Sequence, residues 1–255
     1  MKKTLLSRIS DYKLLPYLGL ACTSLFWAGN AIVARGFNTE IGPLALAFHR
    51  WLVCALLVSP FIVRAIYRHR HLLIQSWHRV LVLAFLSVTT FNSLLYMAAQ
   101  HTTALNITLV NSLLPITTLL LAIPLFRQRI SVKNGLGVAV AFAGALYVIL
   151  QGDIMQLWAL GVNRGDITMA IAMLVWSVYS LLLRKWALPI PGFDLFAILT
   201  GLGLLVLLPF YYWEYQVIGG FIWTPDLTMV ILYVAVFPSL LAYLFWNYGV
   251  TQTSP

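Results

Sequence analysis

The sequence predicts an all-α membrane protein, a polytopic helical bundle built from inverted five-helix repeats. Of its 255 residues, 61% are hydrophobic and 9% are charged, whereas a soluble domain carries about 25% charged residues. Apolar runs of about 20 residues, long enough to cross a bilayer as a helix, recur along the chain. A short pattern also occurs twice, 149 residues apart, which indicates an internal repeat.

Eight apolar runs are predicted to span the membrane. The connections between them are short and leave no room for a large soluble domain. The runs are Leu14–Ala34, Pro43–Ile66, Val80–Ala99, Ala104–Phe126, Asn134–Leu150, Ile167–Leu183, Phe193–Tyr212 and Leu227–Val250.

The basic residues predict how the chain is oriented. Thirteen of the 16 precede the first span or lie at or beyond the ends of the second, fourth and sixth spans. The alternate loops hold only Arg35 and Arg164, and Arg50 lies inside a span. Because basic residues concentrate in cytoplasmic loops, the N-terminus is predicted to be cytoplasmic. Topology therefore explains the net charge of +9, and nucleic acid is not expected as a partner.

The repeated pattern predicts two halves of opposite orientation. The stretch LFWAGNAIVARGF (Leu25–Phe37) is echoed by LVWSVYSLLLRKW (Leu174–Trp186), with Trp27 matching Trp176. Five spans lie within this interval, and an odd number makes the second copy cross the membrane in the opposite direction. Inverted repeats of this kind build many secondary transporters.

A second echo supports the same division. The stretch Tyr96–Thr103 at the end of the third span resembles Asn247–Ser254 at the end of the eighth, with an offset of 151 residues. We expect residues 1–150 to form a first five-helix repeat and residues 151–255 a second one that lacks its last two helices. Ten helices are then expected in the full protein and about eight in this chain. The alternative is an eight-helix protein with unequal halves.

Four motifs spread over the chain resemble the EamA-type members of the drug/metabolite transporter (DMT) superfamily. They are Leu25-Phe-Trp-Ala-Gly-Asn30, Gly42-Pro-Leu-Ala-Leu-Ala-Phe-His-Arg50, Asn111-Ser-Leu-Leu-Pro115 and Leu241-Ala-Tyr-Leu-Phe-Trp-Asn247. The resemblance implies ten helices in two inverted halves with both termini in the cytoplasm. It also implies movement of small metabolites, often outward, through a central cavity.

Arg50 is a candidate anchor for the solute. It lies seven residues past Pro43, about 10 Å into its span at 1.5 Å per residue. An arginine in hydrocarbon costs free energy, so its presence calls for a role. It could bind a carboxylate or phosphate of the solute. Alternatively, it could be bonded to helix carbonyls, or its side chain could extend to the outer membrane interface.

Other polar and aromatic residues recur on single helix faces inside the spans. A cavity walled by tryptophan and tyrosine with a few amides suits an amphipathic organic solute. Proline weakens a helix, so Pro115 and Pro238 are predicted helix breaks. The predicted substrate-binding residues are Trp27, Asn30, Arg50, Asn92, Tyr96, Asn111, Trp176, Tyr179, Tyr243, Trp246 and Asn247.

The fifth span is predicted to pack against other helices, away from the solute. Gly137, Ala141 and Ala145 are four residues apart, and small residues at this spacing let helices approach closely.

These observations together predict a secondary transporter that exports small organic metabolites, such as amino acids or related organic anions, by alternating access. We expect it in the plasma membrane, the inner membrane in a bacterium, with the lipid bilayer and a small-molecule substrate as partners. The sequence does not decide whether the protein forms a homodimer. The alternatives are a scaffold or receptor that transports nothing, and a membrane-embedded enzyme. No protease, hydrolase or phosphate-loop motif is present, so no catalytic residue, cofactor or metal is predicted. The arginines in Arg68–His71 would repel a metal cation, and this segment is predicted to be a basic loop.

Overall fold

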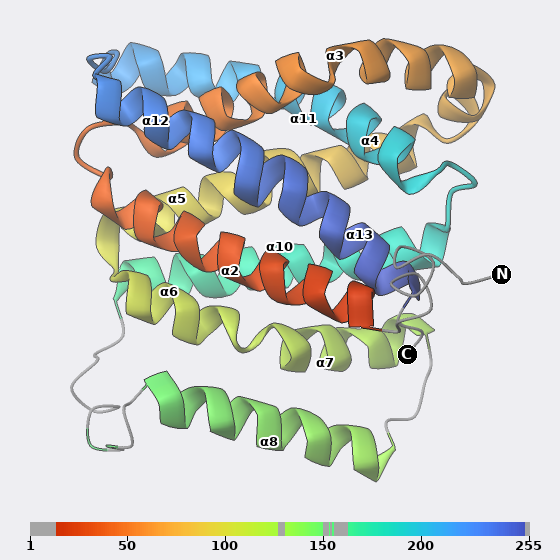
Figure 1. The fold of residues 1–255 in the computed structure, drawn as a ribbon, viewed down its shortest axis with the longest axis vertical. Coiled ribbons are helices and arrows are strands. Elements are labelled where there is room, and N and C mark those ends of the chain that lie inside the picture. The colour runs from red at the N-terminus through yellow and green to blue at the C-terminus, as the bar shows by residue number, and fades with distance from the viewer. Residues whose placement is uncertain (1–13, 127–130, 150–152, 154, 156–162, 253–255) are drawn as a thin grey trace, which may run out of the picture.

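A computed structural model describes residues 14–126, 131–149, 153, 155 and 163–252 (Figure 1). In this part of the chain all regular structure is helical, which confirms the predicted all-α, polytopic fold class. The helices are α2 (Leu14–Gly36), α3 (Pro43–Gln75), α4 (Trp77–Ala84), η1 (Phe85–Thr90), α5 (Phe91–His101), α6 (Ala104–Asn111), α7 (Leu114–Phe126), α8 (Val132–Ile149), α10 (Arg164–Trp186), α11 (Gly192–Ile218), α12 (Pro225–Val234), η2 (Ala235–Leu241) and α13 (Ala242–Gln252).

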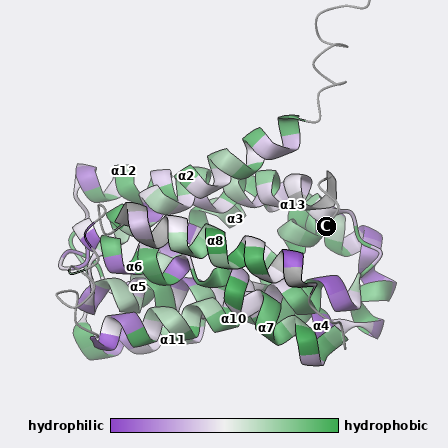
Figure 2. Ribbon diagram, turned by 90° about the horizontal axis from the view of Figure 1, so that it is seen from below, coloured by the Kyte–Doolittle hydropathy of each residue, from purple (hydrophilic) through white to green (hydrophobic). Residues whose placement is uncertain are grey.

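Seven helical segments among the described residues are long and apolar enough to cross a membrane. They match all the predicted spans except the fifth, which corresponds to α8 and contributes the shorter apolar stretch Gly135–Gly144. Figure 2 shows hydrophobic residues along most of the helices and hydrophilic residues mainly towards the two ends of the bundle. This distribution is the one that a bilayer requires.

The bundle has a basic end and an opposite end. At the basic end α3, α7 and α10 finish and α4, α8 and α11 begin (Figure 1). This end carries Arg68, Arg79, Lys133, Arg184 and Lys185. At the opposite end α2, α5 and α11 finish and α3, α6, α10 and α12 begin.

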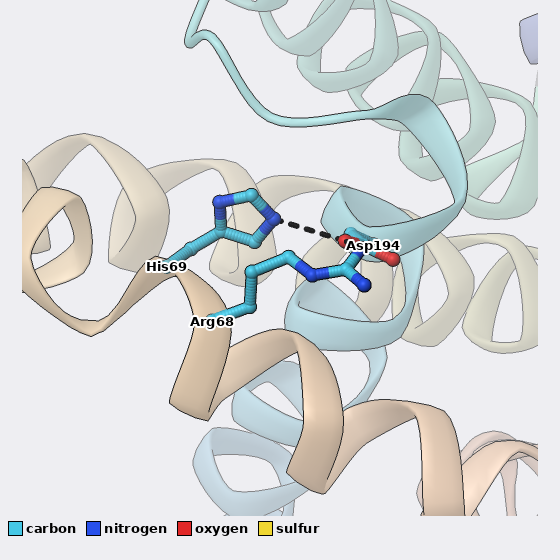
Figure 3. Close-up of polar contacts among 3 residues, drawn as sticks. All are labelled: Arg68, His69 and Asp194. Carbon is cyan, nitrogen blue, oxygen red and sulfur yellow. Dashed lines mark hydrogen bonds and ion pairs between the residues drawn. The ribbon is translucent and has the colours of Figure 1, made fainter.

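Each end is held by contacts between distant segments. At the basic end Asp194, in the first turn of α11, lies 3.3 Å from Arg68 and 2.9 Å from His69 (Figure 3). The predicted basic loop is wrong here, because α3 continues as a helix through Arg68 and His69 to Gln75. At the opposite end Glu214 of α11 accepts hydrogen bonds from the backbone N–H groups of Leu44 (2.9 Å) and Ala45 (2.7 Å), at the start of α3.

The helices pack with an approximate twofold relation. α2 and α10 run in opposite directions, as do α3 and α11 (Figure 1). The pairs that pack most extensively are α3 with α11, α2 with α13, and α10 with α5. Exchanging α2 with α10, α3 with α11 and α5 with α13 converts the second pair into the third and leaves the first unchanged. These contacts fit the inverted arrangement, while the division at residues 1–150 and 151–255 stays a prediction.

The two π-helical segments recur at the same interval as the sequence echoes. η1 starts at Phe85 and η2 starts at Ala235, an offset of 150 residues. In η2, Pro238 has no N–H to bond the carbonyl of Val234, and the hydroxyl of Ser239 donates to that carbonyl instead, at 2.7 Å. Widened π turns misalign backbone carbonyls and are frequent at functional sites.

The start of α10 lies so close to the end of α5 that it requires a glycine. A Cβ atom on Gly165 would lie 2.6 Å from the carbonyl oxygen of Ala98 and 2.8 Å from the backbone nitrogen of Thr102. Asp166 fixes the contact from the next residue, because it accepts a hydrogen bond from the Thr102 hydroxyl at 2.5 Å.

We therefore expect Gly165→Ala to destabilise the protein. The backbone on either side must move apart, and overpacking of this kind costs about 1–3 kcal/mol. The matched control is Gly137→Ala in α8, where an added Cβ meets nothing within 4 Å. Thermal unfolding of the purified protein in detergent should show a lower midpoint for Gly165→Ala alone, and equal midpoints for both variants would contradict the proposed close contact.

Candidate functional site

A central cavity of about 600 Å³ lies between the helices. Its volume falls in the range of small-molecule sites. The lining residues come from α2, α3, α5, α6, α7, α8, α10 and α13, as well as from the α6–α7 connection. The predicted site residues among them are Trp27, Asn30, Arg50, Asn92, Asn111, Pro115, Trp176, Tyr243 and Trp246.

Arg50 lies in the wall of this cavity with 1% of its surface exposed. One terminal nitrogen donates to Tyr96 Oη at 3.0 Å and to Asn30 Oδ1 at 3.3 Å. The other donates to the carbonyl of Pro238 at 3.0 Å, and Nε donates to Ser239 Oγ. Four of its five N–H groups are therefore bonded within the protein.

The partners of Arg50 hold its guanidinium without neutralising it. They are two hydroxyls, an amide oxygen and a backbone carbonyl, and among the described residues no carboxylate pairs with Arg50. Trp51 and Tyr96 add cation–π contacts, with ring centroids 5.3 and 5.9 Å from the guanidinium carbon. A buried charge is costly unless it is paired. The cavity therefore offers an oriented positive charge to an anionic group.

The two π segments turn backbone carbonyls towards the centre of the bundle. In η2, the carbonyl of Pro238 accepts from Trp27 Nε1 at 3.2 Å as well as from Arg50. In η1, the carbonyl of Ser87 accepts from Asn92 Nδ2 at 2.9 Å and from Tyr243 Oη at 3.3 Å. The same local distortion thus orients a cavity residue in each half.

An aromatic cluster closes one side of the cavity. The rings of Trp27 and Trp176 meet edge to face, with centroids 5.5 Å apart. Tyr243 packs against Trp176 at 5.7 Å, and Trp246 packs against Trp27 at 5.4 Å. The two tryptophans that the sequence echo relates therefore touch each other at the centre of the bundle.

The side-chain oxygens of Asn92 and Asn30, two amides of the predicted site, differ in the hydrogen bonds that they accept. Asn92 is buried, and its Oδ1 has no hydrogen-bond partner within the described residues. Asn30 Oδ1 accepts from both Arg50 and Tyr96. An unpaired buried acceptor is costly to leave unbonded. Asn92 is therefore the amide of the two that has an acceptor free for a ligand donor.

The remaining predicted residues lie in different places. Tyr96 accepts a hydrogen bond from Arg50 but does not line the central cavity. Tyr179 lines a second cavity instead. The side chain of Asn247 lies outside the described ones. The helix is interrupted at residues 112–113, just before Pro115, whereas at Pro238 it continues through η2. The regular α-helix therefore gives way to a π segment around Pro238, and the chain stays helical because the π turn absorbs the missing N–H.

The prediction for the fifth span is also wrong. Val138, Ala141 and Phe142 of α8 line the central cavity. Cβ atoms added at Gly137 and Gly144 would meet nothing within 4 Å, so these small residues do not mediate a close helix contact. Spacing alone could not distinguish a packing face from a cavity wall.

Sequence reasoning missed Trp51 and Thr200. Both side chains are fully buried, and Trp51 Nε1 and Thr200 Oγ1 have no hydrogen-bond partner among the described residues. A signal was available, because Thr200 is the sole hydroxyl residue in the apolar run from Leu195 to Phe210. The two positions are also 149 residues apart, the same interval as Trp27 and Trp176.

The fold defines a multi-pass α-helical membrane protein, and its central cavity has the volume of a small-molecule site. A model of the EamA-like transporter family matches residues 14–150 and 163–255. The chain therefore belongs to the EamA-like transporter family, and it is a membrane transporter of the EamA type in the DMT superfamily.

Similar proteins are transporters from archaea and bacteria. An uncharacterized transporter of Archaeoglobus fulgidus is 28% identical over 243 residues, which cover 92% of this chain and 80% of that protein. The uncharacterized transporter YyaM of Bacillus subtilis is 27% identical over 179 residues, covering 68% of this chain and 56% of that protein. An uncharacterized transporter of Methanothermobacter thermautotrophicus is 21% identical over 246 residues, covering 86% of this chain and 71% of that protein.

Proposed function

We propose that the protein is a secondary transporter that exports small organic metabolites with a carboxylate, such as amino acids or related organic anions. The observation that carries this proposal is the buried guanidinium of Arg50, which lines the cavity without a carboxylate partner among the described residues. A carboxylate of the solute would supply the missing counter-charge, and its apolar part would pack against the aromatic cluster.

The packing of the helices supports alternating access as the mechanism. The exchange of α2 with α10, α3 with α11 and α5 with α13 preserves the main helix contacts. A bundle of this kind can adopt two related states, in which the access side changes by movement of one repeat against the other. We assign residues 1–150 and 151–255 to these repeats. The basic end would face the cytoplasm of a bacterial cell, with the protein in the plasma membrane.

Transport by the purified full chain tests the proposal. Proteoliposomes are loaded with a panel of labelled amino acids and organic acids, and initial efflux rates are compared with those of empty liposomes. Efflux of at least one carboxylate solute is expected. If no member of the panel leaves faster than from empty liposomes, a scaffold or receptor becomes the better interpretation.

We expect Trp27→Ala to lower the efflux rate at least about tenfold, since truncating a central aromatic residue of a binding site costs about 2 kcal/mol or more. Trp27 lines the cavity, contacts Trp176 and Trp246 and bonds the carbonyl of Pro238. The matched control is Trp213→Ala, because Trp213 is 60% exposed. A similar loss in both variants would show that the effect is not specific to the cavity.

A further inference from the structure

A second cavity of about 220 Å³ lies nearer the basic end. Leu183 in the last turn of α10 and Gly192 at the start of α11 line it on this side. Tyr243 and Trp246 line both cavities, so these two side chains stand between them. The wall between the two spaces is thus made of side chains, which can change rotamer without refolding a helix.

The second cavity is the apolar counterpart of the surroundings of Arg50. At the offset of 149 residues that relates Trp27 to Trp176, Arg50 corresponds to Leu199, which lines the second cavity. A leucine therefore takes the place of the arginine, and none of the described residues that line the second cavity is charged.

Two unbonded polar groups stand in this apolar wall. Trp51 Nε1 is a donor, and Thr200 Oγ1 can donate or accept. Both residues line the second cavity, both side chains are fully buried, and neither atom has a partner within the described part of the chain. They come from corresponding positions of α3 and α11, the two helices that pack on each other most extensively. Burying a donor without an acceptor is unfavourable, so a bound molecule that forms hydrogen bonds with these two groups would be stabilised here.

We infer that the second cavity is a binding site for a compact uncharged group that carries a hydroxyl or carbonyl oxygen. The oxygen accepts from Trp51 Nε1 and bonds Thr200 Oγ1, while the rest of the group packs against the aromatic and aliphatic wall. The inference rests on the proposed transport function and extends it, because it makes this cavity a second binding position for the uncharged part of the solute. The binding itself does not depend on whether transport occurs.

The test compares two small aromatic probes, p-cresol and toluene, on the full chain in lipid nanodiscs. The hydroxyl of p-cresol supplies the oxygen, and toluene lacks it. Apparent dissociation constants come from the shift of the thermal unfolding midpoint with probe concentration. We expect p-cresol to bind about two- to tenfold more tightly than toluene, the gain of a typical hydrogen bond.

Variants assign that preference to the cavity. Trp51→Phe and Thr200→Val should each reduce the preference for p-cresol, while toluene continues to bind and thereby reports that the cavity is folded. Thr228→Val is the matched control, because Thr228 is exposed and its hydroxyl bonds the carbonyl of Thr224. Equal affinities for the two probes, no binding of either, or a preference that survives both variants would overturn the inference. Efflux from proteoliposomes that contain the same variants separates this outcome from a failure of the proposed function.

Discussion

Replacing Arg50 by leucine should remove the ability to distinguish a carboxylate solute from its amide. The solute pair is one labelled amino acid and its primary amide, offered at equal concentrations to proteoliposomes. With the wild-type protein we expect the carboxylate form to move at least about thirtyfold faster, because losing a buried charge pair costs about 2–5 kcal/mol. With Arg50→Leu the two rates should become similar.

This readout separates an anchoring role from a structural one. Arg50 is bonded to Asn30, Tyr96, Pro238 and Ser239, so its replacement also removes bonds that hold α2, α3, α5 and η2 together. A purely structural arginine would lower both rates by the same factor and leave their ratio unchanged. That result would refute the anchoring role.

Arg50→Lys supplies the intermediate case. Lysine keeps the positive charge but has a single ammonium group instead of a planar fork, and it cannot reach four partners from the same position. We expect it to retain part of the preference for the carboxylate at a lower absolute rate. The unfolding midpoints of Arg50→Leu and Arg50→Lys, measured in the same detergent, show whether either variant has lost its fold.

The fold could be predicted from the sequence because its signals are local and repeated. Span length follows from bilayer thickness, and the match between Trp27 and Trp176 gave the opposite directions of α2 and α10. The candidate site followed in outline, since Trp27 and Asn30 share one face of the first span and Arg50 is an ionisable residue inside an apolar span. Their roles in binding stay predictions.

The remaining features depend on contacts between distant residues. η1 contains no proline to mark its π turn, and the carbonyl that accepts from Asn92 is exposed only by that turn. The continuation of α3 to Gln75 brings His69 into contact with Asp194, which lies 125 residues further along the chain. The missing partners of Trp51 and Thr200 cannot be seen without the packing of α3 on α11. A pattern along one helix carries no information about which partner is absent across an interface.

Replacing Glu214 by glutamine should destabilise the protein by about 2–4 kcal/mol, since hydrogen bonds to a charged group contribute about 1.5–3 kcal/mol each. The carboxylate is 6% exposed and accepts from Leu44 and Ala45, two of the N–H groups that a helix start leaves without partners. Glutamine presents one acceptor oxygen and turns an N–H₂ group towards the second donor. The negative charge that the positive end of the helix dipole favours is lost as well.

Two matched variants test whether the burial of Glu214 is the reason for the large destabilisation expected of Glu214→Gln. Asp194→Asn removes a carboxylate from the opposite end of the same helix. The asparagine oxygen can still accept from His69, and the ion pair with the half-exposed Arg68 contributes about 0–1 kcal/mol. Glu40→Gln changes an exposed glutamate of the α2–α3 loop. Midpoints of thermal unfolding in one detergent should rank Glu214→Gln far below Asp194→Asn, with Glu40→Gln close to the wild type.

The same substitution should also affect the solute site. Arg50 lies six residues after Leu44 on α3, about 9 Å along the helix axis at 1.5 Å per residue. Because Glu214 fixes the start of this helix, it also fixes the depth of the guanidinium in the cavity. Glu214→Gln should therefore lower the ratio of carboxylate to amide transport, even below the unfolding temperature, while Asp194→Asn leaves that ratio unchanged. A ratio that stays at the wild-type value in Glu214→Gln would show that α3 is positioned by its packing on α11 alone.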